Sequence, residues 1–443
     1  MKTPVYDFAR TYAARGGVRL HMPGHKGTGP LGCEALDLTE IAGADSLYEA
    51  DGILAESERN AAGLFGTGQT FFSAGGSSQC VKAMLLLAVR RAGRRGILAA
   101  RNVHKSFVQA AALLDLEPRW LWPQGPGELL RCDVSEEQLD RALADCDELP
   151  AAVYLTSPDY LGHLQPVDRL AAVCHRYGVP LLVDNAHGAY LHFLSQPCHP
   201  IDLGADLCCD SAHKTLPVLT GGAYLHLAKG ADFGSEEEIR QALSLFGSTS
   251  PSYLILESLD LCNRYLDEIF PAALEKTVGR VAALKKKLTA QGWSVLPGEP
   301  FKITLCTADC GFSGRAVAQQ LRQADIECEY ADPDYLVLMV SPQNPPRDLE
   351  RLADALPPCP GPIGPGAKTF QPDPPRQAVP VRQALFARCE TVPASESVGR
   401  ICAAPTVSCP PAVPVAVSGE VITAGAAAVF AHYGIETVSV LCP

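Results

Sequence analysis

The residues best placed to do chemistry lie at the ends of two apolar segments. Asp184 ends the run PLLVD (180–184), and His187 follows shortly after it, while the run ADLCCD (205–210) leads into Lys214. Ligands of open α/β sheets bind beyond the carboxyl ends of the strands, so both groups are expected at one crevice. Pyridoxal phosphate (PLP) needs a lysine amine for its Schiff base and an acid that keeps its ring nitrogen protonated. The two segments therefore predict a PLP site.

Each of these residues alone also has an ordinary interpretation. A loop lysine such as Lys214 is commonly a solvated surface residue, and an acid such as Asp184 commonly caps the end of a strand. Here Ser211 and His213 flank the lysine, and a Gly-Gly pair (221–222) opens the next apolar run. The combination favours the cofactor site.

A second group of residues could bind the cofactor phosphate. The segment QTFFS begins like a strand, passes into Gly75-Gly76-Ser77-Ser78 and continues as a helical pattern. Backbone N–H groups, hydroxyls and a helix N-terminus together make an anion site. The alternative is a helix start capped by serine. The segment has neither the GKS/T of a P-loop nor the GxGxxG of a dinucleotide loop.

A third candidate is His104, which follows the apolar run GILAA (96–100). An imidazole at such a strand end could stack on a planar cofactor ring. The alternative is a polar loop residue.

The elements that must position these residues form an α/β pattern. Unbroken apolar runs of strand length alternate with segments whose apolar residues recur at three and four, such as 79–93 and 167–178. This alternation predicts a largely parallel sheet with helical crossovers. The expected strands are 96–100, 151–156, 180–184, 205–210 and 221–227.

The pattern changes after about residue 270. A small two-layer α+β domain is expected from KITLCT, the helix-like SGRAVAQQLRQAD, ECEY, YLVLMVS and the helix-like RDLERLADAL. A Pro/Gly-rich linker follows. A terminal subdomain then contains two expected helices, ESVGRICAA (396–404) and ITAGAAAVFAHYG (422–434). The predicted division is 1–270 with the N-terminal segment and large domain, 271–356, 357–380 as linker, and 381–443.

Composition narrows the class of protein. The 443 residues are 47% hydrophobic and 19% charged, which excludes a disordered or coiled-coil chain. A formal net charge of −12 without a long basic run argues against nucleic acid or an anionic membrane as partner. No signal peptide or membrane-spanning run is present, so a cytoplasmic protein is expected. The 17 cysteines lack paired CxxC spacing and indicate reduced, mostly buried thiols, with no metal site predicted.

Several blocks in order resemble the ornithine/lysine/arginine decarboxylases, PLP enzymes of the aspartate-aminotransferase fold (fold type I). The resemblance covers nearly the whole chain, which begins at the HMPGHKG region and is similar to the shorter bacterial form without the N-terminal receiver-like domain. Its C-terminal blocks, ESVGRICA, CPPAVPV and SGE, resemble the C-terminal decarboxylase subdomain of the family. The other blocks are HMPGHKG (21–27), DLTE (37–40), GADSLYEADG (43–52), RNVHKS (101–106), TSPDYLG (156–162), VDNAHGAYL (183–191), DSAHKTLPVLTGG (210–222) and STSPSYLILESLD (248–260).

The resemblance implies a role for each candidate residue. Lys214 forms the internal aldimine, Asp184 pairs with the pyridinium nitrogen, His104 stacks on the ring and His187 lies near the phenolic oxygen. Thr249 is implied to reach the phosphate in a neighbouring subunit, which makes the expected homo-oligomer a dimer or larger; the alternative is that STSPSY caps the following helix. The residues implied to hold the phosphate are Gly76, Ser77, Ser78, Ser211 and His213.

The implied reaction is decarboxylation of a basic amino acid to an amine and CO2, through a quinonoid intermediate, with Lys214 or a nearby His protonating Cα. Arginine, lysine and ornithine stay open as substrates, with arginine or lysine favoured by analogy. Asp45, Glu49 and Asp51 are candidates for binding the distal cation of the substrate, or are surface-loop residues. Asn185 and Tyr190 depart from the family pattern, which has an acid and a His there.

Two other classes of function share these residues. An aminotransferase or another lyase of the same fold would use the same lysine and aspartate, since fold does not fix reaction type. A catalytically silent member could serve as a binding or regulatory subunit. The HMPGHKG and STSPSY blocks argue against the first, and retention of Lys214, Asp184, His104 and His187 argues against the second.

Overall fold

A computed structural model describes residues 1–123, 131–359, 361–362, 364, 366, 374–409 and 413–443. The chain divides into two compact units, residues 1–94 with 167–273 and residues 95–166 with 274–443. The four-part division expected from the sequence stays a prediction. Much of the expected linker and the centre of CPPAVPV lie outside the described residues.

The large sheet has the strand order β1-β7-β6-β5-β4-β2-β3. Strands β5 and β6 pair in parallel, as do β2 with β3 and with β4, whereas β7 is antiparallel to both β6 and β1. The sheet is therefore mixed and mostly parallel, as predicted. Its strands are β1 (Gln69–Ser73), β2 (Gly96–Ala100), β3 (Glu117–Leu121), β4 (Ala152–Thr156), β5 (Leu181–Asp184), β6 (Leu207–Asp210) and β7 (Ala223–Leu227).

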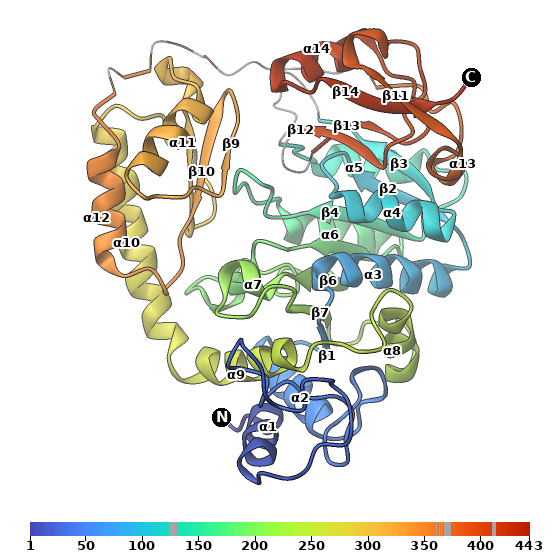
Figure 1. The fold of residues 1–443 in the computed structure, drawn as a ribbon. Helices are drawn as coiled ribbons and strands as arrows, with labels where there is room; N and C mark the ends of the chain where they lie inside the picture. Colours follow the sequence, from blue (N-terminus) through green and yellow to red (C-terminus); the bar gives the residue numbers. More distant parts are fainter. Residues whose placement is uncertain (124–130, 360, 363, 365, 367–373, 410–412) are drawn as a thin grey trace. The chain divides into compact units, whose positions relative to one another are not determined.

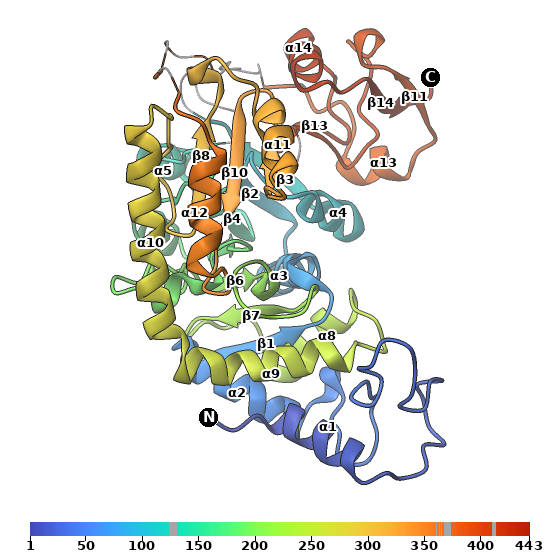
Figure 2. The ribbon, with the colours of Figure 1, turned by 60° about the vertical axis from the view of Figure 1, so that its left-hand side comes forward.

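Helices pack on the strands of the first unit. Every residue of β5, β6 and β7 is buried, which explains why they read as unbroken apolar runs. Figure 2 shows α9 passing β1, with α2 and α1 beyond it. The helices of this unit are α1 (Pro4–Ala14), η1 (Leu47–Glu49), α2 (Ile53–Leu64), α3 (Gly76–Ala92), α6 (Val167–Arg176), η2 (Ala189–Phe193), α7 (Ala212–Thr215), α8 (Glu236–Ser244) and α9 (Tyr253–Glu268).

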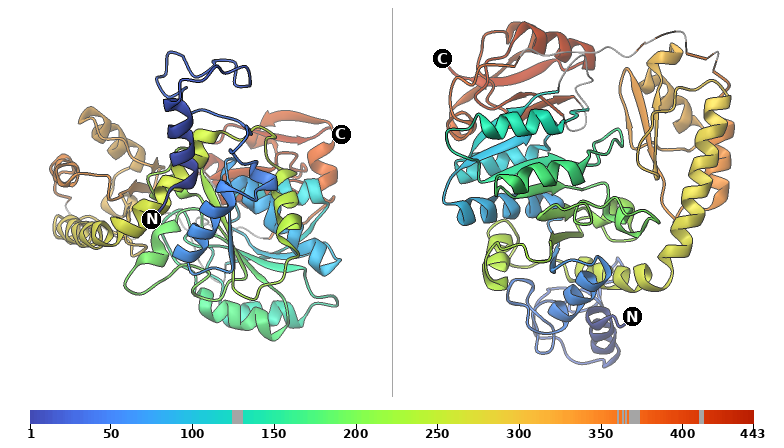
Figure 3. Two further views of the ribbon diagram at one scale, coloured as in Figure 1. Left: turned by 90° about the horizontal axis from the view of Figure 1, so that it is seen from below. Right: turned by 180° about the vertical axis from the view of Figure 1, so that it is seen from behind.

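The second unit contains β4, β2 and β3 together with a small sheet of order β8-β10-β9. An apolar cluster that includes Leu288, Leu321, Leu336 and Leu352 joins this small sheet to three helices. Figure 3 shows the longest of these helices, α10, running alongside the small sheet. The predicted α+β pattern is confirmed. The elements are α4 (Lys105–Leu114), α5 (Glu136–Ala144), α10 (Phe270–Ala290), β8 (Lys302–Cys306), η3 (Ala308–Cys310), α11 (Gly314–Gln323), β9 (Tyr330–Ala331), β10 (Tyr335–Met339) and α12 (Pro346–Ala355).

The C-terminal part of the second unit has two two-stranded sheets and the helix α14 (Figure 1). The expected helix at 422–434 is confirmed as α14, but the one at 396–404 is wrong. Gly399 adopts a φ of 82°, which ends helical geometry, and Ile401 and Cys402 form β-bridges instead. The elements are α13 (Val381–Phe386), β11 (Cys389–Pro393), η4 (Ala394–Glu396), β12 (Thr406–Cys409), β13 (Val413–Val417), α14 (Ala424–Tyr433) and β14 (Thr437–Leu441).

A buried ion pair joins this C-terminal part to the end of β2. Nη1 and Nη2 of Arg101 lie 2.6 and 2.8 Å from the Glu420 carboxylate, and both side chains are 2% exposed. The Arg101 guanidinium also lies over the rings of Trp120 and Trp122. Bidentate geometry and aromatic stacking offset the cost of burying the two charges.

Within the described part of the chain, no helix is both long enough and apolar enough to cross a membrane.

Candidate active site

The turn after β5 holds Asp184 and His187 in buried positions. Asp184 is 3% exposed and His187 is 6% exposed. The Ala186 N–H donates to Oδ1 of Asp184 at 3.2 Å, and the Gly188 N–H donates to the carbonyl of Asn185 at 2.8 Å. Asp184 and His187 therefore both lie buried at the carboxyl end of β5, Asp184 as its last residue and His187 in the tight turn that follows.

Lys214 lies on the short helix α7, which follows β6 (Figure 1). Its Nζ is 3.1 Å from Nε2 of His187. Two residues 27 positions apart thus meet because β5 and β6 pair in parallel and end at the same edge. Lys214 as a residue is exposed.

The start of α3 provides backbone N–H groups and hydroxyls. The helix begins at Gly76, whose φ is +70°, and its N-cap residue is Gly75. Ser77 and Ser78 therefore lie in the first turn of the helix, and neither is the N-cap that the serine-cap interpretation required. The Ser211 hydroxyl donates to Oγ of Ser77 at 2.8 Å, so this helix start and the start of α7 adjoin.

His213 lies in the first turn of α7, and one of its two ring nitrogens already forms a hydrogen bond. Its Nδ1 donates to the Gly222 carbonyl at 3.0 Å. Burial, together with the charge of Lys214, lowers the pKa of His213. Only Nε2 is left for a phosphate, and it must carry a proton to donate a hydrogen bond.

His104 belongs to the second unit, where it is the N-cap of α4. Its Nδ1 accepts from the Ser106 N–H at 3.2 Å and lies 2.8 Å from the Ser106 hydroxyl. Its stacking role on a cofactor ring stays a prediction.

Thr249 lies in the exposed loop between α8 and α9. Ser252 is the N-cap of α9 but forms no side-chain cap hydrogen bond. The structure therefore gives no support to the interpretation of STSPSY as a helix cap through its hydroxyls. The cross-subunit role of Thr249 stays a prediction.

Asp45 has a structural explanation. Its carboxylate accepts from four backbone N–H groups, at distances of 2.8 to 3.3 Å, around the start of α2. Glu49 accepts from the Ser46 hydroxyl at 2.6 Å, and Asp51 is exposed. Of the three candidates for the distal cation, Asp45 is thus already saturated with donors.

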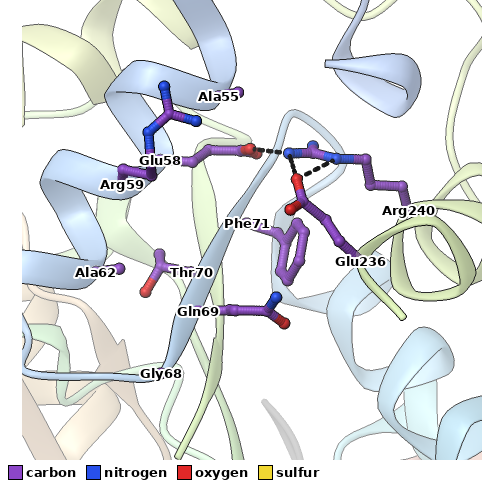
Figure 4. Close-up of a pocket in the computed structure, with 10 residues that line it drawn as sticks. All are labelled: Ala55, Glu58, Arg59, Ala62, Gly68, Gln69, Thr70, Phe71, Glu236 and Arg240. Atoms are coloured by element: carbon purple, nitrogen blue, oxygen red, sulfur yellow. Dashed lines mark hydrogen bonds and ion pairs between the residues drawn. The ribbon is translucent and has the colours of Figure 1, made fainter. Parts of the chain in front are cut away.

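A separate small cavity in the first unit, of about 90 Å³, contains none of the predicted site residues. Figure 4 shows Arg240 reaching over the Phe71 ring toward Glu58 and Glu236 beside this cavity. Burial raises the pKa of Glu58 to about 7, although Arg240 opposes the shift. Arg240 is already paired with both carboxylates, so the cavity offers no unpaired cation from this residue to bind an anion.

An amine beside an imidazole, a buried strand-end carboxylate and a hydroxyl-bearing helix start make up a site of the kind that holds a phosphate-bearing cofactor. Comparisons with known proteins agree with this class. A sequence profile described as Orn/Lys/Arg decarboxylase, major domain, matches residues 3–308. The chain is 30% identical to an arginine decarboxylase of Bacillus subtilis over 95% of this chain and 91% of that protein.

Solved structures share the fold. A lysine decarboxylase of Francisella novicida superposes with a TM-score of 0.80 at 18% identity, over 99% of this chain and 81% of that chain. The constitutive lysine decarboxylase of Escherichia coli gives a TM-score of 0.79 at 19% identity, over 100% of this chain and 82% of that one. The chain belongs to the Orn/Lys/Arg decarboxylase family. It is a PLP-dependent amino-acid decarboxylase of fold type I, and its substrate class is the basic amino acids.

The residues present fit this cofactor. PLP requires an amine for its aldehyde, an acid for its ring nitrogen and an anion site for its phosphate. Lys214, Asp184 and the start of α3 have these three chemistries within one unit. A Cβ added at Gly76 would have no heavy atom within 4 Å, so open space adjoins this helix start. When bound, the cofactor supplies a conjugated ring that accepts the electron pair left by the departing CO2.

Proposed function

We propose that the preferred substrate is arginine, which the chain converts to its amine and CO2. The similarity to the Bacillus subtilis arginine decarboxylase over 95% of this chain carries this proposal. A second arginine decarboxylase, from Halalkalibacterium halodurans, is 28% identical over the same share of this chain. The guanidinium is a planar fork, whereas lysine and ornithine end in a point charge, so a pocket can separate them.

In this proposal Lys214 holds the cofactor through its amine and Asp184 pairs with the ring nitrogen. Gly76, Ser77, Ser78, Ser211 and His213 hold the phosphate. His187 lies near the phenolic oxygen of the cofactor, and His104 stacks on its ring. Once the substrate amine has replaced it, Lys214 Nζ would deliver a proton to the Cα that has lost CO2. The 3.1 Å contact with His187 supports this role because the imidazole could resupply the proton. Orientation of the scissile bond by the pocket selects which bond breaks.

The test is a parallel assay of arginine, lysine and ornithine, each labelled at the carboxyl carbon, with purified protein and added PLP. We expect release of labelled CO2 with kcat/KM for arginine at least about tenfold above the others, because binding differences of 1.4 kcal/mol suffice for that factor. A preference for lysine or ornithine would overturn the arginine assignment. A keto acid formed without labelled CO2 would point instead to the aminotransferase alternative.

We also propose that the working form is a homodimer in which Thr249 completes the phosphate site of the neighbouring chain. Its exposure in the α8–α9 loop, next to a helix it does not cap, supports this role. Mixing inactive Lys214→Ala with inactive Thr249→Tyr under exchanging conditions should restore about a quarter of the wild-type sites, since half of the dimers are mixed.

The matched control for this mixing experiment is Lys214→Ala with Asp184→Asn. Both lesions lie in one chain's own site, so no hybrid site is free of damage and activity should not rise above the residual rate of Asp184→Asn. Failure of the Thr249→Tyr mixture to recover, with subunit exchange demonstrated, would place Thr249 in its own chain's site and refute the sharing.

A further inference from the structure

A buried carboxylate lies at the end of β6, directly before the cofactor-site residue Ser211. Asp210 is fully buried, as are His199 and His226. Its carboxylate lies 3.0 Å from Nε2 of His199, 3.2 Å from Nε2 of His226 and 2.7 Å from Nδ2 of Asn185. The Cys208 thiol lies 3.6 Å away. Four donors therefore surround one buried anion.

A hydrogen bond to Nδ1 of His199 shows which ring nitrogen carries the proton. Nδ1 of His199 accepts from the Ile201 N–H at 3.3 Å, so the ring proton is on Nε2, facing Asp210. Burial alone would raise the pKa of Asp210, but His199 and His226 outweigh it and hold the pKa well below its usual range. Burial lowers the pKa of His226, so that ring stays neutral. The carboxylate of Asp210 is thus an anion that accepts from Nε2–H of each histidine.

A metal ion is the other interpretation of this cluster. Ligand atoms of His199, Cys208 and Asp210 all lie within 4.8 Å of one another. A histidine that binds metal through Nε2 normally donates Nδ1–H to an acceptor, whereas Nδ1 of His199 faces a donor. Burial and the charge of Asp210 also raise the pKa of the Cys208 thiol well above its ordinary value, which disfavours a thiolate ligand. Hydrogen bonding accounts for the cluster better.

The anion links the two strand ends that hold the cofactor-site residues. Asn185 follows Asp184, and its side chain donates to Asp210 across the carboxyl ends of β5 and β6. Ser211 follows Asp210 and donates to Ser77 at the start of α3. A Cβ at Gly188 would lie 1.9 Å from Oδ1 of Asn185, so the glycine is needed for Asn185 to take this position.

We propose that Asp210 is a positioning residue for the cofactor site, which it holds through Asn185 on one side and Ser211 on the other. This inference rests on the proposed roles of Lys214 and Asp184. A carboxylate is required because all four neighbours donate and it accepts from each. Asparagine at this position would turn its own NH2 toward a donor and leave buried groups unpaired.

The test compares Asp210→Asn with Asp206→Asn. Asp206 precedes the same strand, accepts from His175 at 3.0 Å and from the Leu181 N–H at 2.8 Å, and so ties β5 to β6 at the opposite end. PLP binding to the apoprotein is titrated by absorbance, and apoprotein unfolding is measured separately. We expect the PLP Kd to rise about 10- to 100-fold in Asp210→Asn, as for loss of a charged hydrogen bond, and to stay near wild type in Asp206→Asn.

An unchanged PLP Kd in folded Asp210→Asn would refute the positioning role, as would an equal rise in both variants. If Asp210→Asn does not fold, Asn185→Ala takes its place, since it removes only the link to β5 and should also raise the Kd. The exchange Asp210→Asn with Asn185→Asp restores a hydrogen bond between the strand ends and should recover part of the affinity relative to Asp210→Asn alone. No recovery would contradict the link through Asn185.

Two further measurements separate this inference from its alternatives. Stoichiometric zinc in the purified protein, lost in Asp210→Asn, would overturn it in favour of a metal site. Borohydride reduction followed by peptide mapping of the wild type tests Lys214 independently. A label on another lysine would refute the proposed site. If Lys214 carries the label in every variant and the PLP Kd is also unchanged in all of them, only the role of Asp210 is refuted.

Discussion

Replacement of Lys214 by alanine should lower the decarboxylation rate by about 10³-fold or more, because it removes the amine that holds the cofactor and delivers the proton to Cα. The same variant should retain no cofactor linkage after borohydride reduction. Both effects follow from the proposed attachment of the cofactor to Lys214, whose Nζ lies 3.1 Å from Nε2 of His187. CO2 release and mass spectrometry of reduced peptides measure the two effects.

Lys229→Ala is the matched control for this substitution. Lys229 is also an exposed lysine of the first unit, and it lies two residues beyond Leu227, the end of β7. Its loss should leave the rate and the labelled peptide unchanged. Reduced cofactor attached to any residue other than Lys214 in the wild type would show that the lysine has been wrongly assigned.

The strands that hold the site could be predicted from the sequence because parallel strands buried on both faces consist of consecutive apolar residues. The expected runs 96–100 and 180–184 correspond to β2 and β5 almost residue for residue. The strand β3 could not be recognised in this way. It is an edge strand, its residues alternate between exposed and half-buried before Leu121, and it contains Pro118. Strand β3 is stabilised by its pairing with β2 along one side. The periodicity of the sequence does not reveal such a pairing.

The approach of Lys214 to His187 could also be predicted, since two parallel strands that end together bring the following residues together. The network around Asp210 could not. His199 and His226 are 11 and 16 residues from Asp210, and they reach it through a turn and through antiparallel pairing of β7. The one available signal was a charged residue closing the apolar run ADLCCD, which demands partners once it is buried.

Asp184→Asn should keep PLP bound but lower kcat by about 100-fold or more, the scale of losing one preorganised electrostatic partner of the reacting group. An amide at this position can still accept a hydrogen bond from the Ala186 N–H, which now donates to Asp184 at 3.2 Å, so the turn is retained. It carries no negative charge, however, and cannot keep the ring nitrogen of the cofactor protonated. Asp184→Asn therefore tests the effect of the charge while the turn geometry stays the same.

The measurement for Asp184→Asn is kcat alongside the PLP Kd and the apoprotein unfolding midpoint. Asp206→Asn is again the control, since it removes a carboxylate that accepts from the Leu181 N–H at the other end of the same strand pair. A large fall in kcat with little change in unfolding would establish Asp184 as the partner of the ring nitrogen. A rate near wild type would show that Asp184 only caps the strand, because that role needs an acceptor oxygen and no charge.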